Sequence, residues 1–172
     1  MGNRESCYKN VICEFIMSCN ITVRDGSRTD AKAIQAIASP IMKSFGLEPD
    51  FDDLDYELGH FGENYPGSIV QLVACLNDAV IGSVILKAHK ENVAKLTGFY
   101  ISEKQQGKGI GKKLLNVAIQ RAKLLGHESI YLETWDKMES ATNLYQKLGW
   151  EKTIDPDPKS GAERAYILNL KS

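Results

Sequence analysis

The chain has 172 residues, of which 43% are hydrophobic and 25% are charged, and its formal net charge at pH 7 is −1. These values describe a globular domain that can fold without disulfides or a structural metal. The balanced charge argues against a dedicated nucleic-acid binder, which usually carries a basic excess. No run of apolar residues is long enough to cross a bilayer. We therefore expect neither nucleic acid nor a membrane as a partner.

The cysteines and histidines have no spacing that is typical of a metal site. The four cysteines form no C-x-x-C pair and the three histidines are scattered, so we expect no metal and a cytoplasmic protein with reduced thiols. Residues 1–16 contain an apolar stretch, but Glu14 interrupts it and no cleavage signal follows. We expect these residues to be an extension of unknown role, ahead of a single domain over residues 17–172.

Charged residues are unevenly distributed along the chain. Between Lys43 and Lys87 there are eight acidic residues and no basic ones, whereas the stretch from Lys87 to Lys123 is strongly basic. This asymmetry fits a protein with one cationic and one anionic ligand, although two solvated faces would give the same pattern.

In chain order, the first half predicts one strand and two helices. Alternating apolar residues indicate a strand over residues 20–24. Next, Thr29 or Asp30 caps a helix that Pro40 bends or ends. The inner side of this helix is expected to carry Ala33, Ile34, Ile37 and Ile41. A second helix is expected over residues 51–61.

The second half predicts a mixed sheet. The first three of its strands are joined by hairpin-length turns and are therefore antiparallel. A strand, a helix and a strand in succession form a right-handed crossover, so the strands on either side of the first helix should be parallel. The expected elements are strands at 69–76, 80–88, 93–102, 129–135, 150–154 and 165–170, and helices at 109–125 and 139–148.

A glycine-rich loop precedes the first of these two helices. It reads Gln106-Gly107-Lys108-Gly109-Ile110-Gly111-Lys112-Lys113. Unpaired N–H groups at a helix start, the positive end of the helix dipole and the close approach that glycine permits make a seat for a pyrophosphate. A Walker loop is excluded because Lys113 stands where Ser or Thr is needed. A dinucleotide fingerprint is excluded because Lys112 stands where the third glycine is needed.

This loop, followed by Ala141-x-x-Leu144-Tyr145-x-Lys147-x-Gly149-Trp150, resembles the GNAT superfamily of acyl-CoA-dependent N-acyltransferases. The element order agrees from residue 20 to residue 170. The resemblance implies an α/β fold with a mixed, mostly antiparallel seven-stranded sheet, helices on both faces, and splayed parallel strands 4 and 5. It implies acetyl-CoA as cosubstrate, and a homodimer as one option, since many relatives are dimers.

The resemblance also implies which residues contact the cofactor. A bulge near Tyr100 or Ile101 would free backbone N–H groups for the thioester oxygen, and the pyrophosphate would lie on the loop. The implied cofactor-binding residues are Tyr100, Ile101, Gln106, Gly107, Lys108, Gly109, Ile110, Gly111 and Lys112.

Two residues are candidates for acid and base catalysis. Tyr145 matches the family's tyrosine, which protonates the departing thiolate; the alternative is an aromatic core residue. Glu133 is a candidate base for the substrate ammonium; the alternative is a carboxylate paired with a neighbouring lysine. Many members instead carry a glutamate where Lys95 stands, and an asparagine where Met138 stands, one turn before Asn143.

The resemblance implies transfer of an acetyl group from acetyl-CoA to a primary amine by direct attack in a ternary complex. The acidic stretch at residues 48–63 falls in the region that shapes the acceptor pocket in the family, which favours a cationic small molecule. Two alternatives remain open: a protein lysine or N-terminal acetyltransferase, and a non-catalytic acyl-CoA-binding sensor.

Overall fold

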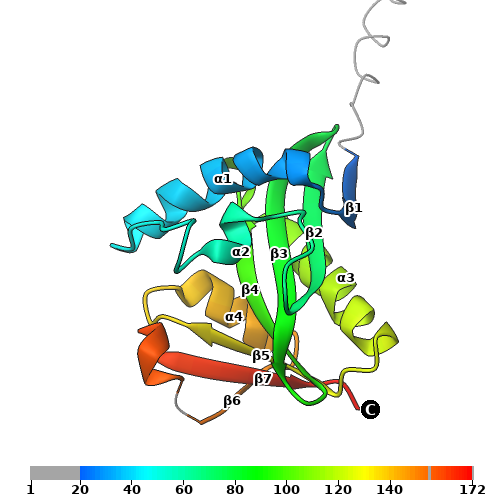
Figure 1. Ribbon diagram of the computed structural model, residues 1–172, viewed down its shortest axis with the longest axis vertical. Helices are drawn as coiled ribbons and strands as arrows, with labels where there is room; N and C mark the ends of the chain where they lie inside the picture. The colour runs from blue at the N-terminus through cyan, green and yellow to red at the C-terminus, as the bar shows by residue number, and fades with distance from the viewer. Residues whose placement is uncertain (1–19, 155, 172) are drawn as a thin grey trace, which may run out of the picture.

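The computed structural model describes residues 20–154 and 156–171, so the expected extension and the domain boundary at residue 17 lie outside the described residues. Within them, seven strands form one sheet in the order β1-β2-β3-β4-β5-β7-β6 (Figure 1). Only β4 and β5 are parallel neighbours. The strands are β1 (Ile21–Asp25), β2 (Ser68–Leu76), β3 (Ala79–Lys90), β4 (Val93–Ile101), β5 (Ser129–Thr134), β6 (Glu151–Lys152) and β7 (Arg164–Asn169).

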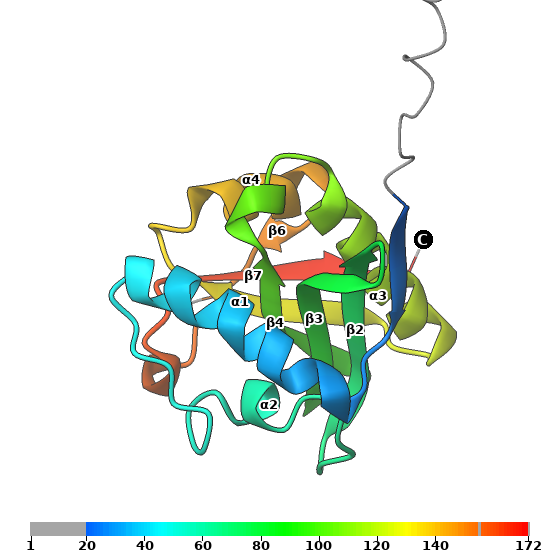
Figure 2. The ribbon, with the colours of Figure 1, turned by 90° about the horizontal axis from the view of Figure 1, so that it is seen from above.

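Helices cover both faces of this sheet, as the resemblance implies (Figure 2). Helices α1 (Ala31–Ser44) and α2 (Tyr56–Gly59) lie on one face, and α3 (Ile110–Leu124) and α4 (Glu139–Lys147) lie on the other. The core accordingly has two halves, one between the sheet and α3 and α4, the other between the sheet and α1 and α2. None of the described helices is both long and apolar enough to cross a bilayer.

Helix α1 differs from its prediction in two respects. It runs through Pro40 to Ser44, so the proline does not end it. Its buried residues are Ile34, Ala38 and Met42, which follow one face at a spacing of four. Because this face packs on the sheet, tertiary burial outweighs the hydrogen bond that Pro40 cannot donate.

The predicted helix over residues 51–61 is wrong, because only α2 is helical there. Asp50 Oδ1 accepts hydrogen bonds from the backbone N–H groups of Asp52 and Asp53, and Asp55 Oδ2 accepts one from the N–H of Asp50. Such side-chain bonds compete with helical ones and favour turns. The acidic stretch therefore forms a turn ahead of a single helical turn.

Helix α3 is tied to the edge strand β1 by two side chains. Lys113 Nζ donates to the carbonyl oxygen of Ile21, and Arg121 Nη2 lies 3.0 Å from Asp25 Oδ2. These contacts join both ends of β1 to the helix.

Strands β4 and β5 pair only at their beginnings. The parallel pairs are Val93 with Ser129, Ala94 with Ile130 and Lys95 with Tyr131, after which the pairing stops although both strands continue. The implied splay of the parallel strands is thus present. We call the point after Lys95 and Tyr131 the fork.

Beyond the fork, β4 contains a bulge. The step from Ser83 to Ile85 in β3 is matched by the longer step from Thr97 to Tyr100 in β4. Gly98 lies within this step at φ +57°, and its carbonyl oxygen accepts a 2.7 Å hydrogen bond from the buried hydroxyl of Ser83. The bulge therefore lies just ahead of Tyr100 and Ile101, where the resemblance implies one.

We expect Gly98→Ala to destabilise the fold by about 2 kcal/mol, because a Cβ there adds backbone strain and a steric clash. The Cβ would lie 2.7 Å from Ile85 Cδ1. Gly46→Ala is the matched control, since Gly46 has φ +77° and no heavy atom within 4 Å of an added Cβ, and it should cost about 1 kcal/mol. Urea unfolding measures both values, and equal losses would contradict a tightly packed bulge.

Candidate active site

A cleft of about 810 Å³ borders the free end of β4. One wall is the end of β4 with the glycine-rich loop, and the opposite wall is α4 with the residues before it. Ile41 of α1 and Phe45, which follows α1, close one side. Of the nine predicted cofactor-binding residues, eight line this cleft: Tyr100, Ile101, Gln106, Gly107, Gly109, Ile110, Gly111 and Lys112. The ninth, Lys108, instead donates a hydrogen bond to the side chain of Gln105.

The loop requires glycine at two positions for conformational reasons. Gly107 and Gly109 have φ values of +74° and +78°, and an added Cβ at either would meet no atom within 4 Å. Glycine is therefore required at both positions by the left-handed backbone conformation and not by a shortage of space for a side chain. In the described chain, no group accepts a hydrogen bond from the N–H groups of residues 107–112. These N–H groups, at the start of α3, form a cradle for an anion.

Gly111 serves packing instead. A Cβ there would lie 3.1 Å from Phe99 Cζ and 3.3 Å from Leu144 Cδ2. Because Gly111 has no Cβ, α3 can approach β4 and α4 closely. The side chain of Gln106 ties the start of the loop to the end of β4, because its Nε2 donates a 3.0 Å hydrogen bond to the carbonyl oxygen of Ile101.

Tyr145 is buried, with 5% of its surface exposed, and does not itself line the cleft, although its neighbours Phe99 and Leu144 do. Its ring lies between Phe99 and Trp150, with centroid separations of 6.0 and 5.7 Å. Burial raises the pKa of its hydroxyl, and the neighbouring Tyr100 raises the pKa further. The hydroxyl therefore keeps its proton well above neutral pH and is able to donate it.

Glu133 lies in a network of donors on the α1 side of the fork. Its carboxylate is 2.5 Å from Lys95 Nζ and accepts hydrogen bonds from Tyr131 Oη and from the backbone N–H of Asp157. Burial raises the pKa of Glu133, but these donors outweigh it and leave the pKa below its ordinary value. This geometry matches the alternative for Glu133, a carboxylate paired with a lysine, except that the side chain is only 6% exposed.

No residue of the acidic stretch lines the cleft, but Asp55 lies near the lining residue Tyr100. Burial raises the pKa of Tyr100 to about 12, and the nearby charge of Asp55 contributes to the shift. The pKa of Asp55 is itself raised, first by burial and then by the like charges of Glu57 and Asp50. Glu57 pairs with Lys87, whereas Asp55 has no cationic partner among the described residues.

Several lining residues were not predicted. Lys137 and Lys147 line the α4 wall, together with Met138 and Asn143. The spacing of Ser140, Asn143 and Lys147 gives them one helical face, but the sequence does not say that this face meets the loop.

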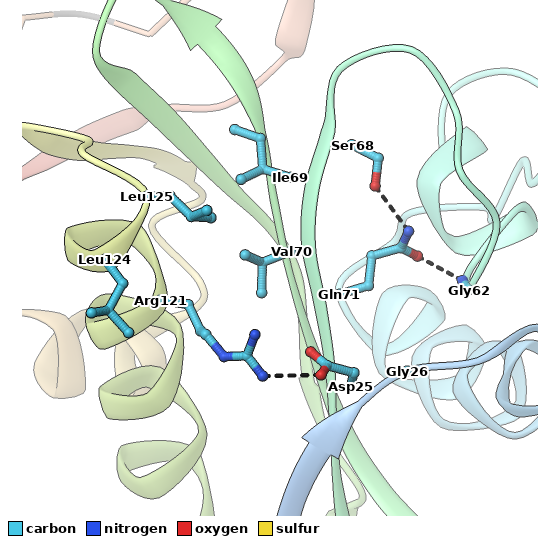
Figure 3. A pocket seen from close by; sticks show the side chains of 10 residues that line it. All are labelled: Asp25, Gly26, Gly62, Ser68, Ile69, Val70, Gln71, Arg121, Leu124 and Leu125. Carbon is cyan, nitrogen blue, oxygen red and sulfur yellow. Dashed lines mark hydrogen bonds and ion pairs between the residues drawn. The ribbon is translucent and has the colours of Figure 1, made fainter.

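A second hollow, of about 450 Å³, lies between β2 and the end of α3 (Figure 3). Its lining includes Ile69, Leu124 and the ion pair of Asp25 with Arg121. It is lined by none of the predicted site residues, all of which the structure describes. Nor do the described residues contain a group of three or more His, Cys, Asp or Glu side chains that could hold a metal ion.

Known proteins include clear relatives of this chain. Residues 32–150 match the model of the acetyltransferase (GNAT) family. The chain is 29% identical to the uncharacterized N-acetyltransferase YjgM of Escherichia coli over 128 residues, which are 71% of this chain and 77% of that protein. A 57-residue stretch is 42% identical to the spermine/spermidine N(1)-acetyltransferase of Bacillus subtilis, covering 33% of this chain and 38% of that protein.

The fold has close counterparts among solved structures. A GNAT-family acetyltransferase of Staphylococcus aureus Mu50 superposes with a TM-score of 0.77 and 26% sequence identity, covering 88% of this chain and all of the other. With the glycine-rich cradle, the splayed strands and the family match together, the chain belongs to the GNAT family and is an acetyl-CoA-dependent N-acetyltransferase.

Proposed function

We propose that this protein transfers the acetyl group of acetyl-CoA to a primary amine of a cationic small molecule, by direct attack in a ternary complex. The observation that carries the proposal is the cleft, which runs from the unpaired N–H groups of the loop to Tyr100 and α1. It offers an anion seat at one end and, near Asp55, negative charge at the other.

The residues of the cleft fit the cofactor. The N–H groups of residues 107–112 suit a pyrophosphate, and Lys112 adds a positive charge. The backbone beyond the bulge, at Tyr100 and Ile101, has no partner on the β5 side, so it is available to the pantetheine arm and to the thioester oxygen. When bound, acetyl-CoA supplies an activated thioester.

Tyr145 is the proposed general acid. Its raised pKa keeps the hydroxyl protonated at neutral pH but also makes it a weaker acid. The acid contribution is therefore modest, and a thiol of pKa about 8.5 needs only modest help at neutral pH. A catalytic role for Glu133 stays a prediction. Its three donors and lowered pKa favour a positioning role, in which it fixes Lys95 at the fork.

Two observations favour a cationic acceptor. First, Asp55 forms no ion pair with a described cation, and its negative charge contributes to the raised pKa of Tyr100 on the cleft wall. In addition, the similar Bacillus subtilis protein is named for spermine and spermidine, which are polyamines. A carboxylate beside the acceptor end attracts an ammonium and orients it.

The first experiment is chromatographic detection of CoA released from acetyl-CoA in the presence of pooled amines near pH 8. The pools are polyamines, amino acids, aminoglycosides and lysine peptides. We expect release that depends on the polyamine or the aminoglycoside pool. Release with lysine peptides alone would instead indicate a protein acetyltransferase, and binding of acetyl-CoA without release from any pool would indicate a sensor.

Tyr145→Phe should lower kcat by about tenfold or more while leaving acetyl-CoA affinity nearly unchanged, because only the proton donor is removed. Tyr65→Phe is the control, since it removes the hydroxyl of another buried tyrosine, one whose neighbours Tyr56 and Ser68 do not line the cleft. Steady-state kinetics and calorimetric titration give the two values. Equal kcat in wild type and Tyr145→Phe would remove the acid from the mechanism.

Replacing Asp52, Asp53 and Asp55 together by asparagine should raise the KM for the cationic acceptor by about tenfold. A change of this size corresponds to the loss of one charge-assisted hydrogen bond. The KM for acetyl-CoA should stay within error, because these residues do not line the cofactor end. Asp78→Asn, in the turn between β2 and β3, removes one carboxylate instead of three and is the control for loss of negative charge outside the acidic stretch. An unchanged acceptor KM would show that the acidic stretch does not select the substrate.

A further inference from the structure

The cleft is lined by lysines on the α4 side as well as by Lys112 of the glycine-rich loop. Its charged lining residues are Lys112, Lys137, Lys147 and Glu139. No carboxylate of the described chain pairs with any of these three lysines within 4.0 Å. Other lysines nearby are engaged, since Lys113 contacts the carbonyl of Ile21. The cleft therefore holds unneutralised cations on both of its walls.

Two of these lysines lie next to residues at which the two walls are in close contact. Gly111 of α3 approaches Leu144 of α4 closely enough that an added Cβ would lie 3.3 Å from Leu144 Cδ2. Lys112 follows Gly111 directly, and Lys147 lies three residues after Leu144, on the α4 face that lines the cleft. Lys137 precedes α4, so the length of the helix, about 13 Å, separates it from Lys147.

Coenzyme A presents two kinds of phosphate. The loop N–H groups suit the pyrophosphate, whose charges are spread over a diester-like chain. The 3′-phosphate is a monoester that carries about two negative charges near neutral pH and strongly accepts hydrogen bonds. A lysine ammonium is a point charge that pairs well with such a group.

We propose that Lys147 binds the 3′-phosphate of coenzyme A, with Lys112 beside it, and that this contact makes the protein discriminate coenzyme A from its 3′-dephospho form. The proposal rests on the proposed function only in requiring that the cleft takes acetyl-CoA. Lys147 is thus a specificity-determining residue on α4, separate from the loop that holds the pyrophosphate.

The test is calorimetric titration of the full chain with coenzyme A and with 3′-dephospho-coenzyme A, which needs no turnover. Wild type should bind coenzyme A about tenfold more tightly than the dephospho form. Lys147→Gln should weaken coenzyme A binding by about tenfold, leave dephospho-coenzyme A binding nearly unchanged, and so abolish the discrimination.

Two variants with the same charge change serve as controls. Lys137→Gln removes a lysine from the far end of the cleft, and Lys123→Gln removes one from α3 outside the cleft lining. Both should keep the wild-type ratio of affinities. Thermal unfolding of each variant checks that it is folded.

Three results would overturn the assignment. The first is equal affinity of wild type for coenzyme A and its dephospho form. The second is a Lys147→Gln variant that loses affinity for both ligands equally, and the third is a Lys147→Gln variant that keeps the wild-type ratio of the two affinities. The second would assign Lys147 to the pyrophosphate. All three leave the acetyltransferase proposal standing, whereas failure of wild type to bind either ligand would remove both proposals.

Discussion

The end of pairing between β4 and β5 is the constraint on which the site depends. In a regular parallel sheet the two strands would bond along their whole length, and side chains would fill the space between the helices above them. Here the ladder stops after Lys95 and Tyr131. The bulge at Gly98 turns β4 away just beyond that point, and the freed backbone becomes a cleft wall instead of a core strand.

Glycine and charge then give this cleft its chemistry. The left-handed backbone at Gly107 and Gly109 turns the chain so that α3 begins with its N–H groups free. On the other side of the sheet, the pairing of Glu133 with Lys95 leaves the fork electrically balanced, while Asp55 is left unbalanced. The charged residues that line the cleft are three lysines and Glu139, whereas the acidic stretch ahead of α2 lies outside this lining, with Asp55 near Tyr100.

Local pattern predicted most elements and located the glycine-rich loop that lines the cleft, because strand alternation, turn residues and glycine loops are short-range signals. Of its two options at Pro40, a bend or an end, the end is excluded because α1 continues to Ser44. It failed at residues 51–61, where aspartate side chains replace helical hydrogen bonds. It could not find Lys137 or Lys147 as lining residues, because that depends on how α4 packs against α3. The roles of Tyr145 and Glu133, a cytoplasmic location and a homodimer stay predictions.

The contacts between β1 and α3 have a mechanical consequence. Lys113 and Arg121 hold the helix to opposite ends of the edge strand, and the first turn of the same helix presents the anion cradle. The position of the cradle therefore depends on the edge strand β1 as well as on the sheet beneath α3. Loss of either side-chain contact would leave the helix held to β1 at one point instead of two.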